Sequence, residues 1–136
     1  MTHSCQLRIP LDTAELARAR AELAEALLAG GFPADLVPRV LIAIDEALTN
    51  IIEHGQCTAG TIDIVCVVEP AQCTITIQDQ GRAFDPRQAP AVDIQEHVAA
   101  GRSGGLGLHL MRRIMDVIDY HHEAGKGNRL TMIKHA

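Results

Sequence analysis

Three groups of polar residues in this sequence could do chemistry, and the first lies within the segment VLIAIDEALTNIIEH (40–54). Glu46, Asn50 and His54 follow one another at intervals of four, which places them in one line along a helix. A carboxylate can take a proton from a water or a hydroxyl, and an amide oxygen can bind a hard cation such as Mg²⁺. A solvated stripe on a surface helix is the alternative. The dense apolar residues around Asp45 and Glu46 weaken that alternative.

The second group ends the segment CTITIQDQG (73–81). Apolar and polar residues alternate through this segment, and Asp79 falls in phase with the apolar set. A carboxylate at the end of a buried row needs a partner, because burial without one is costly. Asp79 is therefore either an acceptor at the floor of a ligand pocket or the first residue of a D-Q-G-R turn. In the first case, Gly81 would let the backbone approach a ligand closely.

The third group is the segment GRSGGLGL (101–108), which runs directly into an apolar helix pattern. Its four glycines are Gly101, Gly104, Gly105 and Gly107. They free backbone N–H groups next to a helix N-terminus, a geometry that suits phosphate, and Arg102 and Ser103 would add a charge and a hydroxyl. The spacing matches neither the dinucleotide-binding fingerprint nor the P-loop. A flexible connector is the alternative.

The elements that must position these groups follow from the apolar periodicity. Strands are predicted at 4–9, 61–69, 73–79, 117–122 and 128–135, and helices at 13–29, 34–54 and 107–116. The first helix is expected to bury Leu16, Ala17, Ala21, Leu23, Leu27 and Leu28. The stretch 80–106 is predicted to be a long loop with a helical turn near 93–99. This order predicts an α+β fold, a two-layer sandwich with helices on one face of a mixed, mostly antiparallel sheet.

Length and composition limit the class of protein. The 136 residues indicate a single domain over 1–136, and 47% hydrophobic residues can supply its core. A net charge of −5 and only 2% aromatic residues disfavour direct binding of nucleic acid by phosphate contacts or base stacking. The sequence contains neither an apolar run of about 20 residues nor a secretory leader, so we expect a cytoplasmic protein away from the membrane. The four cysteines are expected to be reduced thiols.

The three groups occur in the order E-x-x-x-N-x-x-x-H, D-x-G-x-A-F-D and G-x-S-G-G-L-G-L. This order resembles the Bergerat-type ATP-binding domain shared by histidine kinases, gyrase B, the Hsp90 chaperone and the MutL repair protein. More closely, it resembles the small stand-alone anti-sigma factor serine/threonine kinases. The likeness spans about residues 36–134.

The resemblance implies a role for each matching residue. Glu46 matches the general base of the family, and Asn50 matches the residue that holds Mg²⁺. Asp79 matches the carboxylate that binds the adenine amino group, with Gly81 and Ala83 beside it.

The phosphate side of the nucleotide is implied by the glycine-rich segment. Its matching residues are Arg102, Ser103, Gly104, Gly105, Leu106 and Gly107, and the stretch 82–103 matches the family's ATP lid. One departure concerns the adenine end, where Gly127-Asn128 stands in place of the Gly-Thr of many relatives. We expect Asn128 to alter the nucleotide contact without abolishing it, and Thr131 is a candidate substitute.

By resemblance, the expected function is that of a bacterial, ATP- and Mg²⁺-dependent serine/threonine protein kinase and anti-sigma regulatory factor. Its partners would be an anti-anti-sigma factor as phosphoacceptor and a sigma factor, and the chain would form a homodimer. The first alternative is a non-catalytic, nucleotide-responsive binding module that sequesters a sigma factor or another regulator. A degenerate relative that no longer binds ATP is the second, which the presence of Glu46, Asn50, Asp79 and Gly107 disfavours.

Overall fold

The computed structural model describes residues 2–55, 57, 60–83, 85, 87 and 106–136. The strands are β1 (His3–Pro10), β2 (Thr61–Val68), β3 (Gln72–Asp79), β4 (Val117–Glu123) and β5 (Gly127–His135). The helices are the 3₁₀ turn η1 (Thr13–Glu15), α1 (Leu16–Ala29), α2 (Val37–His54) and α4 (Leu106–Ile114). Apart from η1, which fell within the predicted helix 13–29, each of these elements was predicted from the sequence to within a few residues. The bounds differ most at the starts of α1 and α2, which begin at Leu16 and Val37 and not at 13 and 34.

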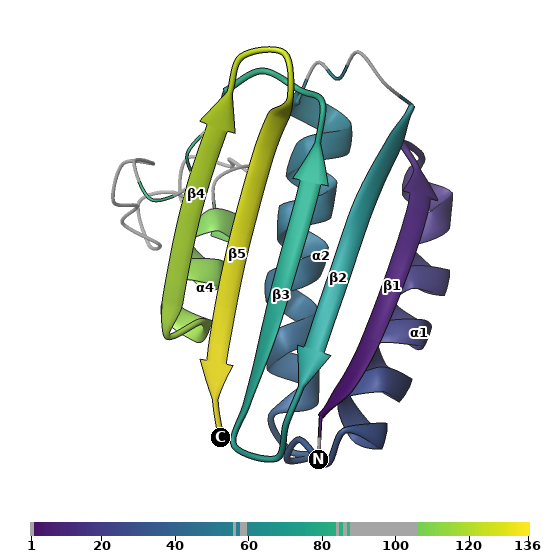
Figure 1. The fold of residues 1–136 in the computed structure, drawn as a ribbon, viewed down its shortest axis with the longest axis vertical. Coiled ribbons are helices and arrows are strands. Elements are labelled where there is room, and N and C mark those ends of the chain that lie inside the picture. The colour runs from purple at the N-terminus through teal and green to yellow at the C-terminus, as the bar shows by residue number, and fades with distance from the viewer. Residues whose placement is uncertain (1, 56, 58–59, 84, 86, 88–105) are drawn as a thin grey trace, which may run out of the picture.

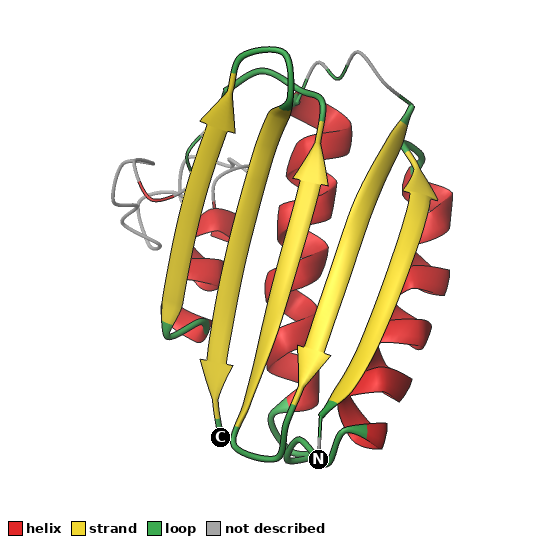
Figure 2. Ribbon diagram, in the orientation of Figure 1, coloured by secondary structure: helices red, strands yellow, loops and turns green. Residues whose placement is uncertain are grey.

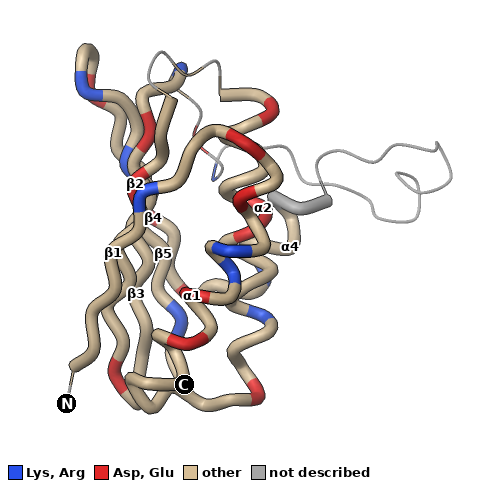
Figure 3. Tube along the Cα trace, turned by 90° about the vertical axis from the view of Figure 1, so that its right-hand side faces the viewer, with Lys and Arg blue, Asp and Glu red and all other residues tan. Residues whose placement is uncertain are grey.

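The strands form one sheet in the order β1-β2-β3-β5-β4, and each neighbouring pair is antiparallel (Figures 1 and 2). The helices cover one face of this sheet, as the side view in Figure 3 shows. The predicted two-layer α+β sandwich is therefore confirmed. The sheet register places Asp79 opposite Asn128, and Asn128 opposite His122, so three strands meet in one row at this end of the sheet.

Helix α1 confirms the predicted helix but turns a different stripe to the core. The buried residues are Leu16, Ala19, Leu23, Ala26 and Leu27. Ala17, Ala21 and Leu28, which the sequence was expected to bury, are exposed. Each of them follows a buried residue by one or two positions, which turns it by roughly 100° or more around the helix toward solvent. The prediction was wrong for these three residues because it assumed a wider buried face than the helix has.

Helix α2 is the central helix of the layer and carries the first polar group. Pro38 lies in its opening turn, where a missing N–H costs little. Its buried face consists of Val37, Val40, Ala43, Ile44, Ala47 and Leu48. The helix ends at Gly55, whose N–H donates to the carbonyl oxygen of Ile51 at 2.9 Å. The C-terminal carbonyls of α2 are thereby brought next to the end of β3, where Asp79 lies.

The core between sheet and helices is aliphatic, with methionine in place of aromatic rings at several positions. Cys66 and Cys73 are fully buried in it, and all four cysteines are free thiols, as the sequence predicted. Burial raises the pKa of Cys66 to about 12 and that of Cys73 to about 11, so both stay protonated at neutral pH. No helix in the described part of the chain is long and apolar enough to cross a membrane.

Candidate functional site

A partly open cavity lies between the C-terminal half of α2, the helix α4 and the strands β3, β4 and β5. Four apolar side chains belong to its lining, namely Ala47, Ile51, Met111 and Leu130. The other lining residues are Asn50, His54, Gly55, Asp79, Arg82, Tyr120 and Asn128. Apolar walls with a few convergent polar groups suit a flat heterocycle that carries hydrogen-bonding edges.

Asp79 is the buried carboxylate of this cavity, with only 5% of its surface exposed. Its Oδ1 accepts from the Gly81 backbone N–H at 2.7 Å and from Asn128 Nδ2 at 3.1 Å, and the Cys57 Sγ lies 3.8 Å away. All three donors reach the same oxygen, so Oδ2 has no donor among the described residues. A buried carboxylate that is half satisfied by the protein can accept a hydrogen bond from an N–H of a ligand.

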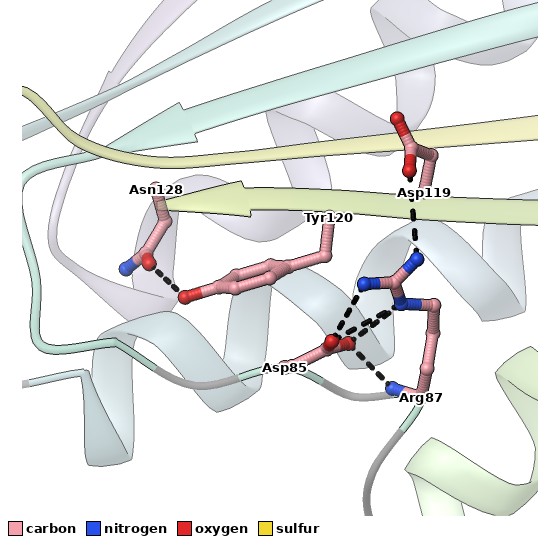
Figure 4. Close-up of polar contacts among 5 residues, drawn as sticks. All are labelled: Asp85, Arg87, Asp119, Tyr120 and Asn128. Carbon is pink, nitrogen blue, oxygen red and sulfur yellow. Dashed lines mark hydrogen bonds and ion pairs between the residues drawn. The ribbon is translucent and has the colours of Figure 1, made fainter. Parts of the chain in front are cut away.

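Asn128 is the residue that joins Asp79 to its surroundings, and it is also buried, at 8% exposure. Besides Asp79, its Nδ2 donates to the carbonyl oxygens of Arg82, at 2.8 Å, and Gly81, at 3.4 Å. Its Oδ1 accepts from the Tyr120 hydroxyl (Figure 4). The same oxygen lies 2.9 Å from Nδ1 of His122. The amide thus links β3, β4 and β5 at the rim of the cavity.

The backbone after β3 packs tightly against the end of α2. Arg82 donates its backbone N–H to the Gly55 carbonyl at 2.8 Å and its Nε to the His54 carbonyl at 3.0 Å, which satisfies two carbonyls at the helix end. A Cβ at Gly81 would lie 2.4 Å from the Gly55 carbonyl oxygen and 2.7 Å from Asp79 Oδ1. Gly81 is therefore required sterically by the approach of the chain to Gly55 and Asp79, and its predicted approach to a ligand stays a prediction.

The other end of the site is the polar line on α2. Asn50 and His54 line the cavity, whereas Glu46 lies one helical turn before Asn50 and is not part of the lining. Burial, then the negative charges of Asp45 and Glu53, raise the pKa of Glu46 above its ordinary value. A carboxylate whose pKa is raised in this way is a stronger base and a better proton acceptor near neutral pH.

The remaining predicted site residues are placed less completely. Ala83 is exposed beside the site, and Leu106 and Gly107 form the first turn of α4. Most of the predicted lid (82–103), the helical turn near 93–99, and the residues Arg102, Ser103, Gly104 and Gly105 lie outside the described residues. Thr131 has the opposite parity to Asn128 along β5 and faces away from the cavity, so it is not a substitute for the family's threonine.

An ion pair outside the cavity ties the segment after Gly81 to β4. Arg87 contacts the Asp85 carboxylate at 2.7 Å and Asp119 at 3.5 Å (Figure 4). Hydrogen bonding to Arg87 lowers the pKa of Asp85. The Arg87 side chain is exposed, so the pair is expected to contribute little to stability.

Sequence reasoning missed three polar residues of the site, Cys57, Tyr120 and His122. His122 is exposed, but one ring nitrogen reaches Asn128. The predicted hairpin of 117–122 and 128–135 contained the missing signal, because closing it tightly puts His122 opposite Asn128. Among the described residues, no group of three His, Cys, Asp or Glu could hold a metal ion.

Known proteins resemble this chain over most of its length. Residues 9–134 match the family described as "Histidine kinase-like ATPase domain". The chain is 32% identical over 125 residues to the serine-protein kinase RsbW of Bacillus cereus, covering 88% of this chain and 78% of the relative. It is 28% identical over 127 residues to the RsbW of Staphylococcus aureus, covering 88% and 80%.

A solved structure supports the fold alone. The histidine kinase domain of the blue-light activated histidine kinase EL346 from Erythrobacter litoralis superposes with a TM-score of 0.50 at 18% sequence identity. The match covers 93% of this chain and 61% of the solved chain. The shared part is thus a kinase-type ATPase fold, and the solved chain extends well beyond it.

Proposed function

Because the chain belongs to the histidine kinase-like ATPase family, and within it to the anti-sigma factor serine/threonine kinases, we propose that it binds ATP with Mg²⁺ and phosphorylates a serine or threonine of a partner protein. The observation that carries the proposal is Asp79, a buried carboxylate in an apolar cavity. A polar line on α2 lies at the other end of the same cavity. The two features together suit a nucleotide whose base is buried and whose phosphates reach outward.

The base of the nucleotide would be recognised by Asp79. Its Oδ2 accepts the adenine 6-amino group, while Oδ1 stays with Gly81 and Asn128. Guanine carries an oxygen at the corresponding position, and two acceptors facing each other repel. The site therefore favours adenine over guanine, with Ile51 and Met111 providing apolar contact.

The transfer step would take place at the α2 end. The Asn50 amide oxygen fits a hard cation, because Mg²⁺ usually takes only one or two protein ligands beside phosphate oxygens and water. When bound, Mg²⁺ supplies charge neutralisation for the phosphates. Glu46 takes the proton of the acceptor hydroxyl as that oxygen bonds to phosphorus, and ADP leaves. The raised pKa of Glu46 suits this role, since a stronger base accepts the proton more readily.

The partners belong to the same proposal. The relatives are serine-protein kinases by name, which supports a protein hydroxyl as the acceptor. By family analogy the acceptor would be an anti-anti-sigma factor, the second partner a sigma factor, and the active form a cytoplasmic homodimer without bound nucleic acid. The alternative is a nucleotide-responsive module that holds its partner without phosphorylating it. Glu46 distinguishes the two, because only the kinase needs a base.

The decisive experiment is phosphotransfer with the purified chain, Mg²⁺, γ-labelled ATP and a bacterial lysate. We expect an acid-stable labelled band, and we expect Glu46→Gln to lower the rate about 10²–10⁴-fold. The same variant should bind ADP with unchanged affinity in calorimetry, because Glu46 is not part of the cavity lining.

Each other outcome overturns part of the proposal. An acid-labile band would indicate phosphohistidine or phosphoaspartate in place of phosphoserine or phosphothreonine. Transfer by Glu46→Gln at the wild-type rate would remove Glu46 as the base. Intact ADP binding without any labelled band would favour the binding module.

A further inference from the structure

Asn128 has used nearly all of its hydrogen-bonding capacity within the protein. A side-chain amide has two donor hydrogens and an oxygen that accepts two bonds. The two hydrogens are directed at Asp79 Oδ1 and the Arg82 carbonyl oxygen, at 3.1 and 2.8 Å, with the Gly81 carbonyl at 3.4 Å. The oxygen is occupied by the Tyr120 hydroxyl and by His122 Nδ1. Asn128 is therefore held by its neighbours and, in turn, holds Asp79.

The sheet register explains why these particular residues meet. Asp79, Asn128 and His122 are direct neighbours across β3, β5 and β4. Tyr120 precedes His122 by two residues, so both side chains leave β4 on the same face. Figure 4 shows the Tyr120 ring extended toward the Asn128 amide. The order of contacts runs from β4 through Asn128 to the carboxylate in the cavity.

The acceptors around Asn128 decide how the amide is oriented. The Asp79 carboxylate and the Arg82 carbonyl oxygen can only accept, so Nδ2 lies on their side and Oδ1 lies on the side of β4. A flipped amide would face the Asp79 carboxylate with its own oxygen, and two acceptors in contact repel. The Tyr120 hydroxyl then donates to Oδ1, and His122 Nδ1 does so when it carries the hydrogen, so both β4 contacts hold the amide in this orientation.

We propose that Tyr120 and His122 are positioning residues that act through Asn128 to set the selectivity of Asp79 for the 6-amino group of adenine. This inference rests on the proposed nucleotide function. Neither residue needs to touch the nucleotide for this role. Their contribution is to hold the Asn128 amide from the β4 side, so that Nδ2 stays within hydrogen-bonding distance of Asp79 Oδ1 and Oδ2 is left for the ligand.

The test compares two nucleotides that differ only at the 6-position of the base. Calorimetry gives the dissociation constants of ADP and of purine riboside 5′-diphosphate, which has a hydrogen in place of the amino group. For the wild type we expect ADP to bind about 10–150-fold more tightly, the range of one hydrogen bond to a charged group. Tyr120→Phe keeps the ring against the cavity and removes only the hydroxyl. We expect it to lower the selectivity ratio about 2–10-fold.

His122 provides a matched pair of variants. His122→Ala removes the donor and should lower the selectivity ratio, by less than Tyr120→Phe because His122 is exposed. His122→Asn can place an amide N–H near the position of Nδ1, and we expect it to restore the ratio. A merely structural role would weaken both nucleotides equally and leave the ratio unchanged. Unfolding curves without nucleotide verify that each variant is folded.

A double-mutant cycle separates action through Asn128 from direct contact, since Tyr120 also lines the cavity. In the background of Asn128→Ala, the Tyr120→Phe change should no longer alter the selectivity ratio. An undiminished effect in that background would overturn the proposal in favour of direct contact. If Asn128→Ala does not fold, His122→Ala still decides the question through the ratio, because His122 does not line the cavity.

The failure of this inference differs from the failure of the proposed function. A wild-type chain that binds neither nucleotide overturns both. A wild-type chain that prefers ADP, with variants that keep the wild-type ratio, overturns only the roles of Tyr120 and His122.

Discussion

The two ends of the cavity are built in different ways. At the base end, Asp79 and Asn128 are buried, lie on neighbouring strands and share a network of short contacts with the backbone after β3. At the helix end, Glu46 and Asn50 are half buried and make no side-chain hydrogen bond within the described residues. The end that we propose to bind the base is thus organised before a ligand arrives. At the helix end, burial and then the neighbouring charges raise the pKa of Glu46.

The organisation of the base end depends on a close backbone approach at Gly127. A Cβ there would lie 2.1 Å from the Asp79 carbonyl oxygen, and the φ of +92° is strained for any other residue. We expect Gly127→Ala to lose about 1–3 kcal/mol of unfolding free energy from strain and about 1–3 kcal/mol more from the clash. Urea unfolding measures the sum, and ADP affinity should fall with it.

Gly125 is the matched control for this substitution. It has a φ of +84°, but no atom lies within 4 Å of a Cβ built on it. Gly125→Ala therefore reports the strain alone and should leave ADP binding intact. Equal losses in the two variants would show that the contact with the Asp79 backbone does not matter, and the base end would then be less tightly built than described.

The next effect concerns binding without a change of fold. Asp79→Asn keeps the size of the side chain but removes its charge and can turn an N–H toward the ligand. We expect ADP affinity to fall about 10–150-fold, because a hydrogen bond to a charged group contributes about 1.5–3 kcal/mol. At saturating ATP, the transfer rate should stay near that of the wild type, since Glu46 is untouched. Calorimetry and single-turnover kinetics measure the two quantities separately.

Glu46→Gln is the contrasting variant. We expect it to lose phosphotransfer and to keep its affinity for ADP. If Asp79→Asn lowered the transfer rate at saturation as strongly as it weakened binding, the two ends would be coupled. The division of labour between them would then be wrong.

Much of this architecture could be predicted from the sequence, and the reason is periodicity. Asp79 was expected to face inward because strand alternation fixes which side each residue takes, and it is buried. The line from Glu46 to His54 follows from the helical repeat in the same way. Each of these two predictions concerns a single strand or helix, whose periodicity can be seen directly in the sequence.

The network behind Asp79 could not be predicted in this manner, because it depends on pairing between elements. His122 meets Asn128 only once the register of β4 on β5 is fixed, and Cys57 approaches Asp79 from the chain beyond α2. Residue types alone gave no reason to choose His122 over His121. The length of the turn between β4 and β5 indicates their register. The contact between His122 and Asn128 gains a role in the site only because β3 places Asp79 on the other side of Asn128.

Cys57 provides a smaller test of the base end. Its Sγ lies 3.8 Å from Asp79 Oδ1, and burial followed by the Asp79 charge raises its pKa. We expect slow reaction with N-ethylmaleimide at neutral pH, slowed further several-fold by saturating ADP. Cys5 is the matched control, since its pKa is also raised by burial but it lies on β1. Mass spectrometry reports both sites at once. Protection of Cys5 to the same degree would indicate global stabilisation and not occupancy of the cavity.

The smallest expected effect is a shift in the pH dependence of phosphotransfer, and it tests how neighbouring charges act on Glu46. The pKa of Glu46 is raised first by burial, next by Asp45 and last by Glu53. A base must be ionised, so transfer is full above this pKa and is lost as pH falls through it. The acidic limb of the rate profile should therefore lie above the range of an ordinary glutamate. Asp45→Asn removes one repelling charge, lowers the pKa of Glu46 and moves the limb to lower pH.

Glu53→Gln is the graded comparison, because its charge raises the pKa of Glu46 less than Asp45 does. We expect a shift in the same direction and of smaller size. Asp45 also contacts Arg20 at 3.6 Å, but both side chains are partly exposed, so the variant should lose at most about 1 kcal/mol of stability. If neither variant moves the limb, the titrating group is not Glu46. If both move it equally, the two charges act alike on Glu46, and the larger effect expected of Asp45 is wrong.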